Sequence, residues 1–191
     1  MNEVMPEGLK IIHPRVFQDG RGYFFESYNA SRLEELGVND KFVQDNESCS
    51  AKYVMRGLHY QLEPTAQSKL VRVVKGEVID FALDIRKDSP TFGKTYYVYL
   101  SAENKAQFYI PHGFAHGFIS LADETIFAYK CDGYYSKENE RGISLFDESL
   151  HILRDLNIFA QRSLCLKLDF SNINVSDKDR SHPSFKDADL L

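Results

Sequence analysis

The chain consists of short apolar segments separated by brief polar turns. Several segments alternate apolar and polar side chains, as in Val71-Arg72-Val73 and Ile79-Asp80-Phe81, and this period of two is typical of strands that bury one face. Turn-forming residues such as Lys75-Gly76 and Lys87-Asp88-Ser89-Pro90 lie between the segments. The pattern predicts ten strands: Leu9–Phe17, Gly22–Tyr28, Phe42–Asp45, Val54–Gln61, Leu70–Val74, Val78–Ile85, Thr95–Leu100, Gln107–Ile110, Phe118–Leu121 and Thr125–Cys131.

Helical patterns are few and short. One helix is predicted over Arg32–Leu36, with Asn29 or Ser31 as its N-cap and Gly37 at its end. The segment His151–Phe159 has near-helical apolar spacing, although its apolar content also permits a strand. Ten strands with so little helix predict an all-β barrel or sandwich, and in a small barrel the polar strand faces can line a pocket.

Composition narrows the possible partners. With 191 residues the chain fits a single core, and a net charge of −5 provides no basic field for nucleic acid. No apolar run approaches the roughly 18 to 20 residues that cross a bilayer, and no signal peptide is evident, so no membrane partner and a cytoplasmic location are expected. The cysteines Cys49, Cys131 and Cys165 lack CxxC spacing, which indicates reduced thiols rather than disulfides or a zinc knuckle.

Candidate chemistry is concentrated in two histidine-containing segments, Arg56–Gln61 and Ile110–Phe118. A single histidine in a strand is more often structural than functional, but His59, His112 and His116 together could supply three imidazoles to a divalent ion. The run from Pro111 to His116 is similar to the P-x-G-x-x-H motif of metal-binding cupins. The first cupin motif requires H-x-H, whereas this chain has His59-Tyr60-Gln61, and an amide is a poor ligand for a transition metal. A cupin barrel without a metal is therefore favoured.

Proton transfer is the chemistry that such a pocket can perform without a metal. His59 is a candidate base, Tyr129 a candidate acid, and Lys69 a group that could stabilise an enolate oxygen. Each has a structural alternative: Tyr129 is one of eleven tyrosines and could pack a strand, and Lys69 could be a solvated charge at a loop edge.

The chain resembles a known family, the cofactor-independent dTDP-4-dehydrorhamnose 3,5-epimerases, which act on nucleotide sugars. The likeness covers roughly residues 9–148 and resumes near 175–179. The blocks that carry it are specific together, although no single block is: Phe17–Tyr28, Phe42–Asn46, Arg56–Gln61, Lys69–Glu77, Asp88–Gly93, Leu100–Lys105, His112–Phe118 and Val175–Asp179.

The resemblance implies a fold, an activity and an assembly. The fold is a cupin-type β-barrel or jelly roll in one domain over residues 1–191, with a few short helices and a segment of about 150–191 folding back on the barrel. The activity is 3,5-epimerisation of dTDP-4-dehydro-6-deoxy-D-glucose to dTDP-4-dehydro-L-rhamnose, with no cofactor and no metal. The assembly is a homodimer in which N-terminal strands, about residues 1–30, join the partner's sheet.

The resemblance also implies residue roles. His59 is similar to the family's base, Asp179 to the carboxylate that orients it, Tyr129 to the acid on the opposite sugar face, and Lys69 to the group that holds the enolate oxygen. Arginines suit the diphosphate, polar side chains the thymine edge, and an aromatic ring its face. The implied substrate-binding residues are Arg21, Glu26, Gln44, Asn46, Arg56, His116, Tyr135, Glu140 and Lys178.

The C-terminal part departs from the family pattern. The family has a short segment with an acidic residue and Trp after Asp147–Leu150, whereas this chain contains no Trp and has extra residues between His151 and Leu168. The polar tail over 174–191 has the composition of a loose terminus. How this tail brings Lys178 and Asp179 to the barrel does not follow from the sequence.

Two other functions remain open at this level. One is a related epimerase that inverts only C3 or C5, or that accepts another nucleotide. The other is a sugar-nucleotide-binding module that kept the barrel and lost turnover, because fold alone does not fix function. The presence of His59, Lys69 and Tyr129 in one chain argues against the second, since binding alone requires neither an acid nor a base.

Overall fold

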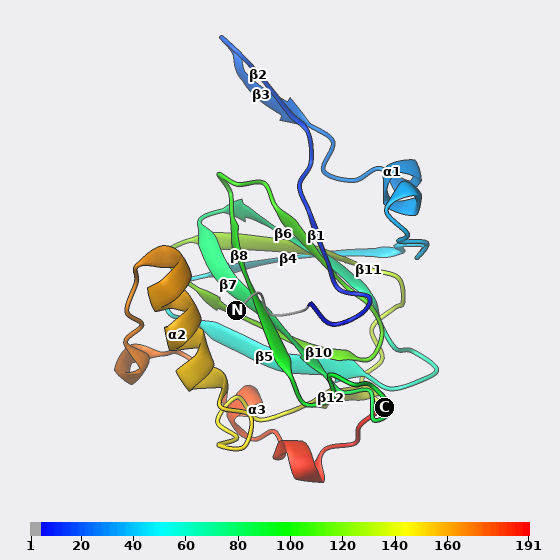
Figure 1. Ribbon diagram of the computed structural model, residues 1–191, viewed down its shortest axis with the longest axis vertical. Coiled ribbons are helices and arrows are strands. Elements are labelled where there is room, and N and C mark those ends of the chain that lie inside the picture. Colours follow the sequence, from blue (N-terminus) through cyan, green and yellow to red (C-terminus); the bar gives the residue numbers. More distant parts are fainter. Residues whose placement is uncertain (1–4) are drawn as a thin grey trace.

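Two five-stranded antiparallel sheets face each other in the computed structural model, which describes residues 5–191. Sheet I has the strand order β1-β9-β6-β11-β4, sheet II has the order β12-β5-β10-β7-β8, and a separate hairpin is formed by β2 and β3. This arrangement confirms the predicted all-β, cupin-type barrel (Figure 1). The strands are β1 Lys10–Ile12, β2 Val16–Asp19, β3 Gly22–Phe25, β4 Gln44–Ser50, β5 Met55–Gln61, β6 Lys69–Lys75, β7 Glu77–Asp84, β8 Thr95–Ser101, β9 Gln107–Ile110, β10 Phe114–Ser120, β11 Thr125–Cys131 and β12 Glu140–Gly142.

The space between the sheets holds the first of two large apolar cores. Alternate residues of β6 and β11, such as Val71, Val73 and Phe127, pack there with buried side chains of the other sheet. Phe118 of β10 stacks on Phe127, with 4.3 Å between the ring centroids. The period of two predicted from the sequence therefore selects which side chains meet between the sheets.

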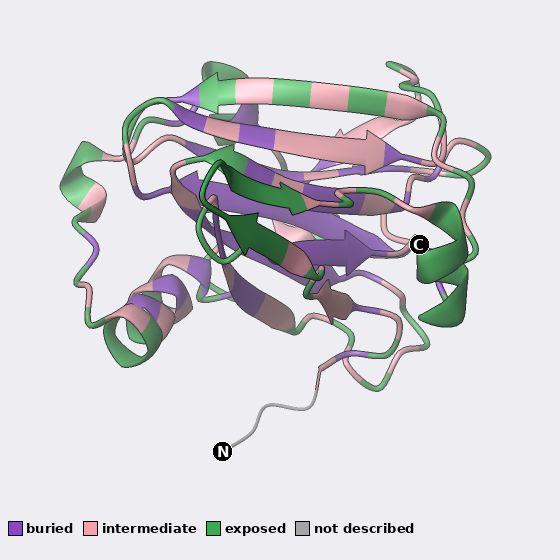
Figure 2. Cartoon of the chain, turned by 90° about the horizontal axis from the view of Figure 1, so that it is seen from above, coloured by how far each residue is buried: buried purple, intermediate pink, exposed green. Residues whose placement is uncertain are grey.

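The second core lies on the outer face of sheet II. Ile79, Phe81 and Leu83 of β7 point away from the barrel interior and pack in one cluster with Leu156 and Ala160 of the C-terminal segment. Because β7 and β10 are covered on both faces, almost all of their residues are buried (Figure 2). The elements after the barrel are α2 Ile152–Leu164, η1 Phe170–Asn172, α3 Asp177–Arg180 and η2 Phe185–Asp187.

The predicted helices form with shifted ends. Helix α1 spans Ala30–Glu35, and the side chain of Asn29 caps it by accepting a hydrogen bond from the Arg32 amide at 3.2 Å. The ambiguous segment after His151 is the helix α2, which buries Ile152, Leu156 and Ala160 at a spacing of four residues. Its helical alternative is therefore correct.

The C-terminal tail is not the loose terminus that its composition alone indicates. Asn174 accepts a hydrogen bond from the Met55 amide at 2.9 Å, and the Ser144 amide donates to the carbonyl of Pro183 at 2.8 Å. At the chain end, the Lys87 amide donates to the carbonyl of Leu191 at 3.0 Å. The polar composition of the tail did not indicate this structure, because backbone hydrogen bonds and a few buried apolar side chains hold the segment. Neither of these requires a high average hydropathy.

Strand boundaries differ from the prediction where the chain turns. The predicted strand Leu9–Phe17 is split into β1 and β2 around Pro14, which has no amide to donate. The short strand β12 was not predicted, because Glu140–Gly142 is polar and has no apolar alternation.

The β2–β3 hairpin projects from the body of the barrel (Figure 1). Its aromatic side chains Phe17, Tyr23 and Phe24 are exposed. Residues 1–4 of the predicted domain and of its N-terminal segment lie outside the described part of the chain. Across residues 5–191, no helix combines the length and apolarity that crossing a membrane requires.

Candidate functional site

Strand register gathers polar side chains at one end of sheet I. Lys69 of β6 pairs with Cys131 of β11, which pairs with Gln44 of β4. Two residues along β11, Tyr129 pairs with Asn46. Since alternate residues of a strand share a face, these five side chains lie on the same face as the interior residues Val71 and Phe127. One end of the barrel interior is therefore polar, and the other is filled with aliphatic and aromatic groups.

His59 of β5 faces this polar end from sheet II. It lines a cavity of about 200 Å³ whose wall includes seven of the predicted site residues. Lys69 and Tyr129 come to the same cavity from sheet I, so His59 and Tyr129 approach it from opposite sheets. The lining residues are Gln44, Asn46, His59, Tyr60, Gln61, Gln67, Lys69, Tyr129, Cys131, Tyr135 and Glu140.

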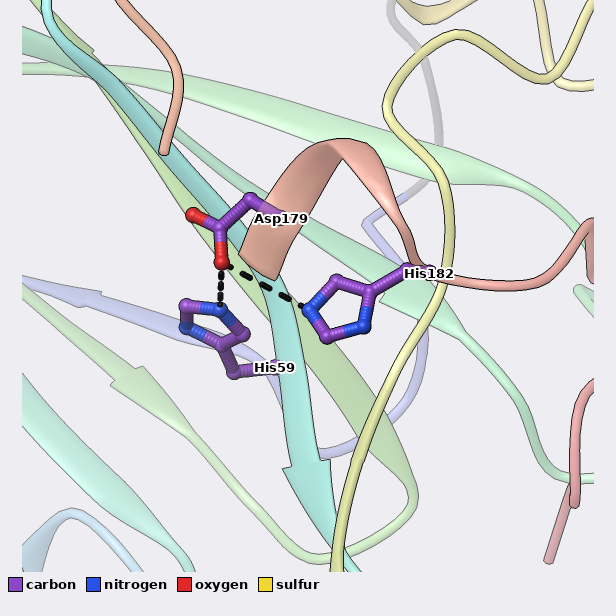
Figure 3. Close-up of side chains that lie close together, drawn as sticks. All are labelled: His59, Asp179 and His182. Carbon is purple, nitrogen blue, oxygen red and sulfur yellow. Dashed lines mark hydrogen bonds and ion pairs between the residues drawn. The ribbon is translucent and has the colours of Figure 1, made fainter. Parts of the chain in front are cut away.

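The side chain of His59 is paired with Asp179 from the C-terminal tail. Nε2 of His59 lies 2.8 Å from Oδ1 of Asp179, although the two residues are 120 positions apart in sequence (Figure 3). The His59 side chain keeps 33% of its surface exposed, whereas that of Asp179 keeps only 6%. The pair therefore combines a buried carboxylate with an imidazole that remains accessible from the cavity.

Two backbone features fix Asp179 in place. Ser176 caps α3 by accepting the Asp179 amide at 3.1 Å, and Oδ2 of Asp179 accepts the Gly57 amide at 3.2 Å. Burial acts to raise the pKa of Asp179, but the hydrogen bond and charge of His59, with the Gly57 amide, lower the pKa overall. Position 57 needs glycine because a Cβ atom there would lie 2.6 Å from the Gly117 Cα of neighbouring β10.

Burial changes the proton affinities of the two groups contributed by sheet I. Desolvation lowers the pKa of Lys69, while Cys131, Asp80 and Glu140 oppose that shift. Desolvation raises the pKa of the Tyr129 hydroxyl, which Cys131 raises further. Lys69 therefore gives up its proton more readily, and Tyr129 retains its proton more strongly, than the same side chains do on a solvated surface. Such shifts are typical of residues that take part in proton transfer.

Gln61 holds one rim of the cavity. Its Nε2 donates to the carbonyl of Thr65 at 2.6 Å and to that of Tyr134 at 3.2 Å, and its Oε1 accepts the Ser136 amide at 2.7 Å. The residue that replaces a cupin metal ligand thus fastens the loop that presents Tyr135. A histidine side chain could not accept one hydrogen bond from a backbone amide and also donate two hydrogen bonds in this geometry.

The same rim connects three predicted substrate-binding residues. Lys178 donates to Oε1 of Glu140 at 2.6 Å, and the Tyr135 hydroxyl donates to Oε2 of Glu140 at 2.9 Å. Tyr135 is 56% exposed, so one face of its ring is available to a flat ligand. Below them, Gln44 donates to Asn46 at 2.9 Å, which fixes the two amides relative to each other.

The three histidines that could have formed a metal site are paired with three different carboxylates. His112 lies 2.8 Å from Asp132 and His116 lies 2.9 Å from Asp80, while His59 pairs with Asp179. Each imidazole therefore has a hydrogen-bond partner of its own.

A different group of potential ligands does converge within residues 5–191. Atoms of His59, Asp179 and His182 lie within 4.8 Å of one another. Ligands at about 2.0 to 2.2 Å on a tetrahedral zinc ion stand roughly 3.3 Å apart. The 2.8 Å between His59 and Asp179 is shorter and matches a shared proton. The arrangement fits a hydrogen-bonded pair rather than a metal site.

His116 lies behind the cavity wall. It is 7% exposed, contacts both carboxylate oxygens of Asp80 at 2.9 and 3.0 Å, and stacks on Phe127. Desolvation lowers the pKa of His116 and raises that of Asp80. Direct contact of His116 with substrate remains a prediction from the resemblance.

Besides His116 and Lys178, three other predicted binding residues do not line the cavity. Arg21 is at the hairpin, where it pairs with Asp19 at 2.6 Å, and Glu26 accepts a hydrogen bond from Asn29 at 3.0 Å. Arg56 of β5 donates to Ser50 at 3.3 Å. Arg56 also acts to lower the pKa of Tyr129, so its charge reaches the site.

Sequence reasoning missed His182 altogether. It follows α3 and lies 3.5 Å from Asp179, measured from Nε2 to Oδ1, with its ring edge-on to that of His59 (Figure 3). The only available signal was its position three residues after Asp179, and the polar composition of the tail concealed it.

Comparisons with known proteins point to one family. The family described as dTDP-4-dehydrorhamnose 3,5-epimerase matches residues 4–187. The chain is 53% identical over 194 residues to the dTDP-4-dehydrorhamnose 3,5-epimerase of Shigella flexneri, covering 100% of this chain and 99% of that protein. It is similar to the crystal structure of dTDP-4-dehydrorhamnose 3,5-epimerase from Elizabethkingia anophelis NUHP1 (TM-score 0.84, 46% identity, 97% of this chain and 95% of that chain). It is also similar to dTDP-6-deoxy-D-glucose-3,5-epimerase from Legionella pneumophila in complex with dTDP-4-keto-L-rhamnose (TM-score 0.83, 47% identity, 95% and 89% of the two chains).

Proposed function

This chain belongs to the dTDP-4-dehydrorhamnose 3,5-epimerase family, and from that premise we propose how its cavity performs the reaction. The protein is an isomerase that converts dTDP-4-dehydro-6-deoxy-D-glucose to dTDP-4-dehydro-L-rhamnose, a step of dTDP-L-rhamnose biosynthesis. The observation that carries the mechanism is that His59 and Tyr129 reach one cavity from facing sheets.

The substrate's own chemistry requires a base and an acid on opposite sides. A 4-keto group acidifies the hydrogens on C3 and C5, because the negative charge left after proton removal is delocalised onto the ketone oxygen. Removal of a proton from one ring face and delivery to the other inverts the carbon. A base and an acid fixed on facing walls can treat both carbons in turn.

His59 acts as the base. Because Asp179 is ionised and lies 2.8 Å from Nε2, it favours the tautomer with the ring proton on Nε2. Nδ1 then carries the lone pair that accepts the substrate proton. The resulting imidazolium is stabilised by the buried carboxylate, which lacks competing solvent.

Lys69 and Tyr129 complete the proton transfer. The ammonium of Lys69 stabilises the oxygen on which charge develops. The Tyr129 hydroxyl delivers a proton to the opposite face of the carbon, after which solvent restores the protonation of both side chains. The raised pKa of Tyr129 keeps its hydroxyl protonated at neutral pH.

The rim residues bind the nucleotide. Tyr135 stacks on the thymine, while Gln44 and Asn46 offer amide groups to its edge, and Arg56 and Lys178 contribute positive charge near the diphosphate. Tyr135 is positioned by Glu140 and by the Gln61-fastened loop, which supports this role.

A homodimer completes the site. The β2–β3 hairpin, with Arg21 in its turn and Glu26 directly after β3, projects from the barrel (Figure 1), and its exposed aromatic residues are typical of a surface that binds another protein. In a dimer, this hairpin extends the partner's sheet and brings Arg21 and Glu26 to the partner's nucleotide.

The test uses deuterium oxide with the wild type and with Tyr129→Phe. We expect the wild type to give L-configured product with deuterium at C3 and C5. Tyr129→Phe still forms the enolate through His59, so it exchanges protons with solvent while configuration is retained. Normal inversion by Tyr129→Phe would remove this residue from the mechanism.

The same measurement distinguishes the alternatives. Label at one carbon alone would identify an epimerase that inverts only C3 or only C5. Binding of the nucleotide sugar without any label would identify a binding module that has lost turnover. A reductase-coupled assay for the L-configured product, run beside the label analysis, separates exchange from inversion.

A further inference from the structure

A second imidazole, His182, lies behind the carboxylate of the His59–Asp179 pair. Its Nε2 is 3.5 Å from Oδ1 of Asp179, the same oxygen that His59 contacts at 2.8 Å. The two imidazole rings meet edge-to-face, with 5.6 Å between centroids and 82° between planes. The His182 side chain is 11% exposed, and within residues 5–191 its buried Nε2 has no hydrogen-bond partner of normal geometry. A buried polar nitrogen so placed requires an explanation.

The His182 ring occupies a slot that the sheet leaves open for it. Gly142 of β12 pairs with His59 of β5, and a Cβ atom at position 142 would lie 2.3 to 2.5 Å from three atoms of the His182 ring. The carbonyl of the next residue, Pro183, accepts the Ser144 amide at 2.8 Å, which fixes the chain beside the slot. A side chain at position 142 would therefore force the His182 ring to shift.

The electrostatic surroundings keep His182 neutral. Desolvation is the largest effect and lowers its pKa, and the charges of His59 on β5 and Lys178 on α3 act in the same direction. The charges of Asp179 on α3 and Glu140 on β12 act to raise the pKa. A neutral imidazole next to a carboxylate favours the tautomer with its proton on Nε2, directed at Oδ1.

We propose that His182 is a positioning residue that holds the Asp179 carboxylate and limits its pull on His59. Through its Nε2–H, His182 shares the negative charge of Oδ1, so that less of this charge stabilises the protonated form of His59. This inference rests on the proposed role of His59 as the base.

The test compares His182→Phe with His182→Gln. Phe fills the slot without a donor, whereas Gln retains an Nε2 donor on a chain of similar reach. We expect the acid limb of the kcat/KM pH profile of His182→Phe to move up by about half a pH unit, because Oδ1 of Asp179 then loses its polar contact with Nε2 of His182 and interacts with His59 alone. His182→Gln is expected to keep the wild-type limb.

Independent variants separate this role from a purely structural one. Gly142→Ala displaces the ring without changing its chemistry, so it is expected to move the limb in the same direction as His182→Phe. His151→Gln removes an exposed imidazole at the start of α2 and serves as the control, with no shift. Thermal unfolding of each variant shows whether it is folded.

Two outcomes would overturn the inference. One is that the acid limb of the kcat/KM pH profile lies at the same pH in His182→Phe and His182→Gln. The other is that this limb does not shift in a folded His182→Phe variant. Neither would affect the proposed function, which depends on solvent deuterium entering C3 and C5 in the wild type. Absence of that label would instead remove the proposed base chemistry itself.

Discussion

Two histidines lie side by side in sheet II, and each pairs with an aspartate. One of these pairs is buried, and the other is open to the cavity. His59 on β5 and His116 on β10 are paired in the register of the sheet. His116 meets Asp80 of the adjacent strand β7 inside the barrel, where both are buried. His59 instead meets Asp179 from the tail, and a third of its side chain remains open to the cavity.

The two pairs consist of the same residue types. They differ in how exposed the histidine is and in which segment of the chain provides the carboxylate. Both pairs have contacts of 2.8 to 2.9 Å. The carboxylate of Asp80 is supplied by a neighbouring strand and sealed between the sheets, so that its pKa is raised by desolvation. The pKa of Asp179 is lowered despite burial, because His59 and the Gly57 amide stabilise its charge. The open pair can accept a proton from a ligand, whereas the closed pair is suited to hold the barrel together.

The largest effect is expected from removing the open imidazole. His59→Asn should lower kcat by about 10² to 10⁴-fold, because positioned proton transfer contributes roughly that factor. Its unfolding temperature should stay near that of the wild type, since the side chain is partly exposed. The reductase-coupled assay and a thermal melt check both expectations, and retention of more than about a tenth of kcat would contradict the base assignment.

Breaking the closed pair should act on stability instead. Asp80→Ala leaves the buried His116 imidazole without its hydrogen-bond partner and should cost about 1 to 3 kcal/mol in the free energy of unfolding. Denaturant unfolding measures this loss. Asp45→Ala, which breaks the exposed pair with Lys130, is the control and should cost less than about 1 kcal/mol. Equal losses in the two variants would mean that burial does not distinguish the pairs.

A third carboxylate, Asp84, lies on the same strand as Asp80. It tests how the hydrogen-bond partners of a carboxylate change the pH dependence of protein stability. Burial acts to raise its pKa, but hydrogen bonds from Arg86, Ser89 and Thr91 lower it from 3.8 to about 2. Its folded pKa lies below the unfolded value, so its contribution of about 2 kcal/mol is complete above about pH 4 and is lost as pH falls through about 2.

Stability measured from pH 5 down to 2 should therefore fall less steeply in Asp84→Asn than in the wild type. The carboxyl of Asp80 has a raised pKa and contributes with the opposite sign, so the slope identifies Asp84. Identical slopes in the two proteins would exclude Asp84 as the source.

The smallest expected effect is that of chelators, for which we predict no change. His59, His112 and His116 each have a separate carboxylate partner, and Gln61 fastens a loop. Dialysis against EDTA should leave kcat unchanged, with a zinc-dependent hydrolase treated in parallel as a control. Loss of activity that a divalent metal restores would show that these imidazoles act as ligands.

The sequence by itself determined the local part of the site. Period-two alternation predicted a strand beside Lys69 and another that contains Tyr129, because the side chains of a strand alternate whatever the strand pairs with. It also predicted that the polar strand faces could line the pocket, whereas Lys69 and Tyr129 lie on the face that they share with Val71 and Phe127. The sequence left the N-cap open between Asn29 and Ser31 and the segment after His151 open between helix and strand, and the structure selects Asn29 and the helix. The resemblance added Asp179, but not the path by which it reaches His59.

Only the tertiary structure decided the contacts that join distant segments. Asp179 meets His59 across 120 residues because Leu156, Ala160 and other apolar groups of the C-terminal segment pack on the outer face of sheet II. The slot for His182 exists because β12 pairs with β5 and places Gly142 there. Such contacts depend on register and on burial between segments, which a local pattern of apolar and polar residues does not encode.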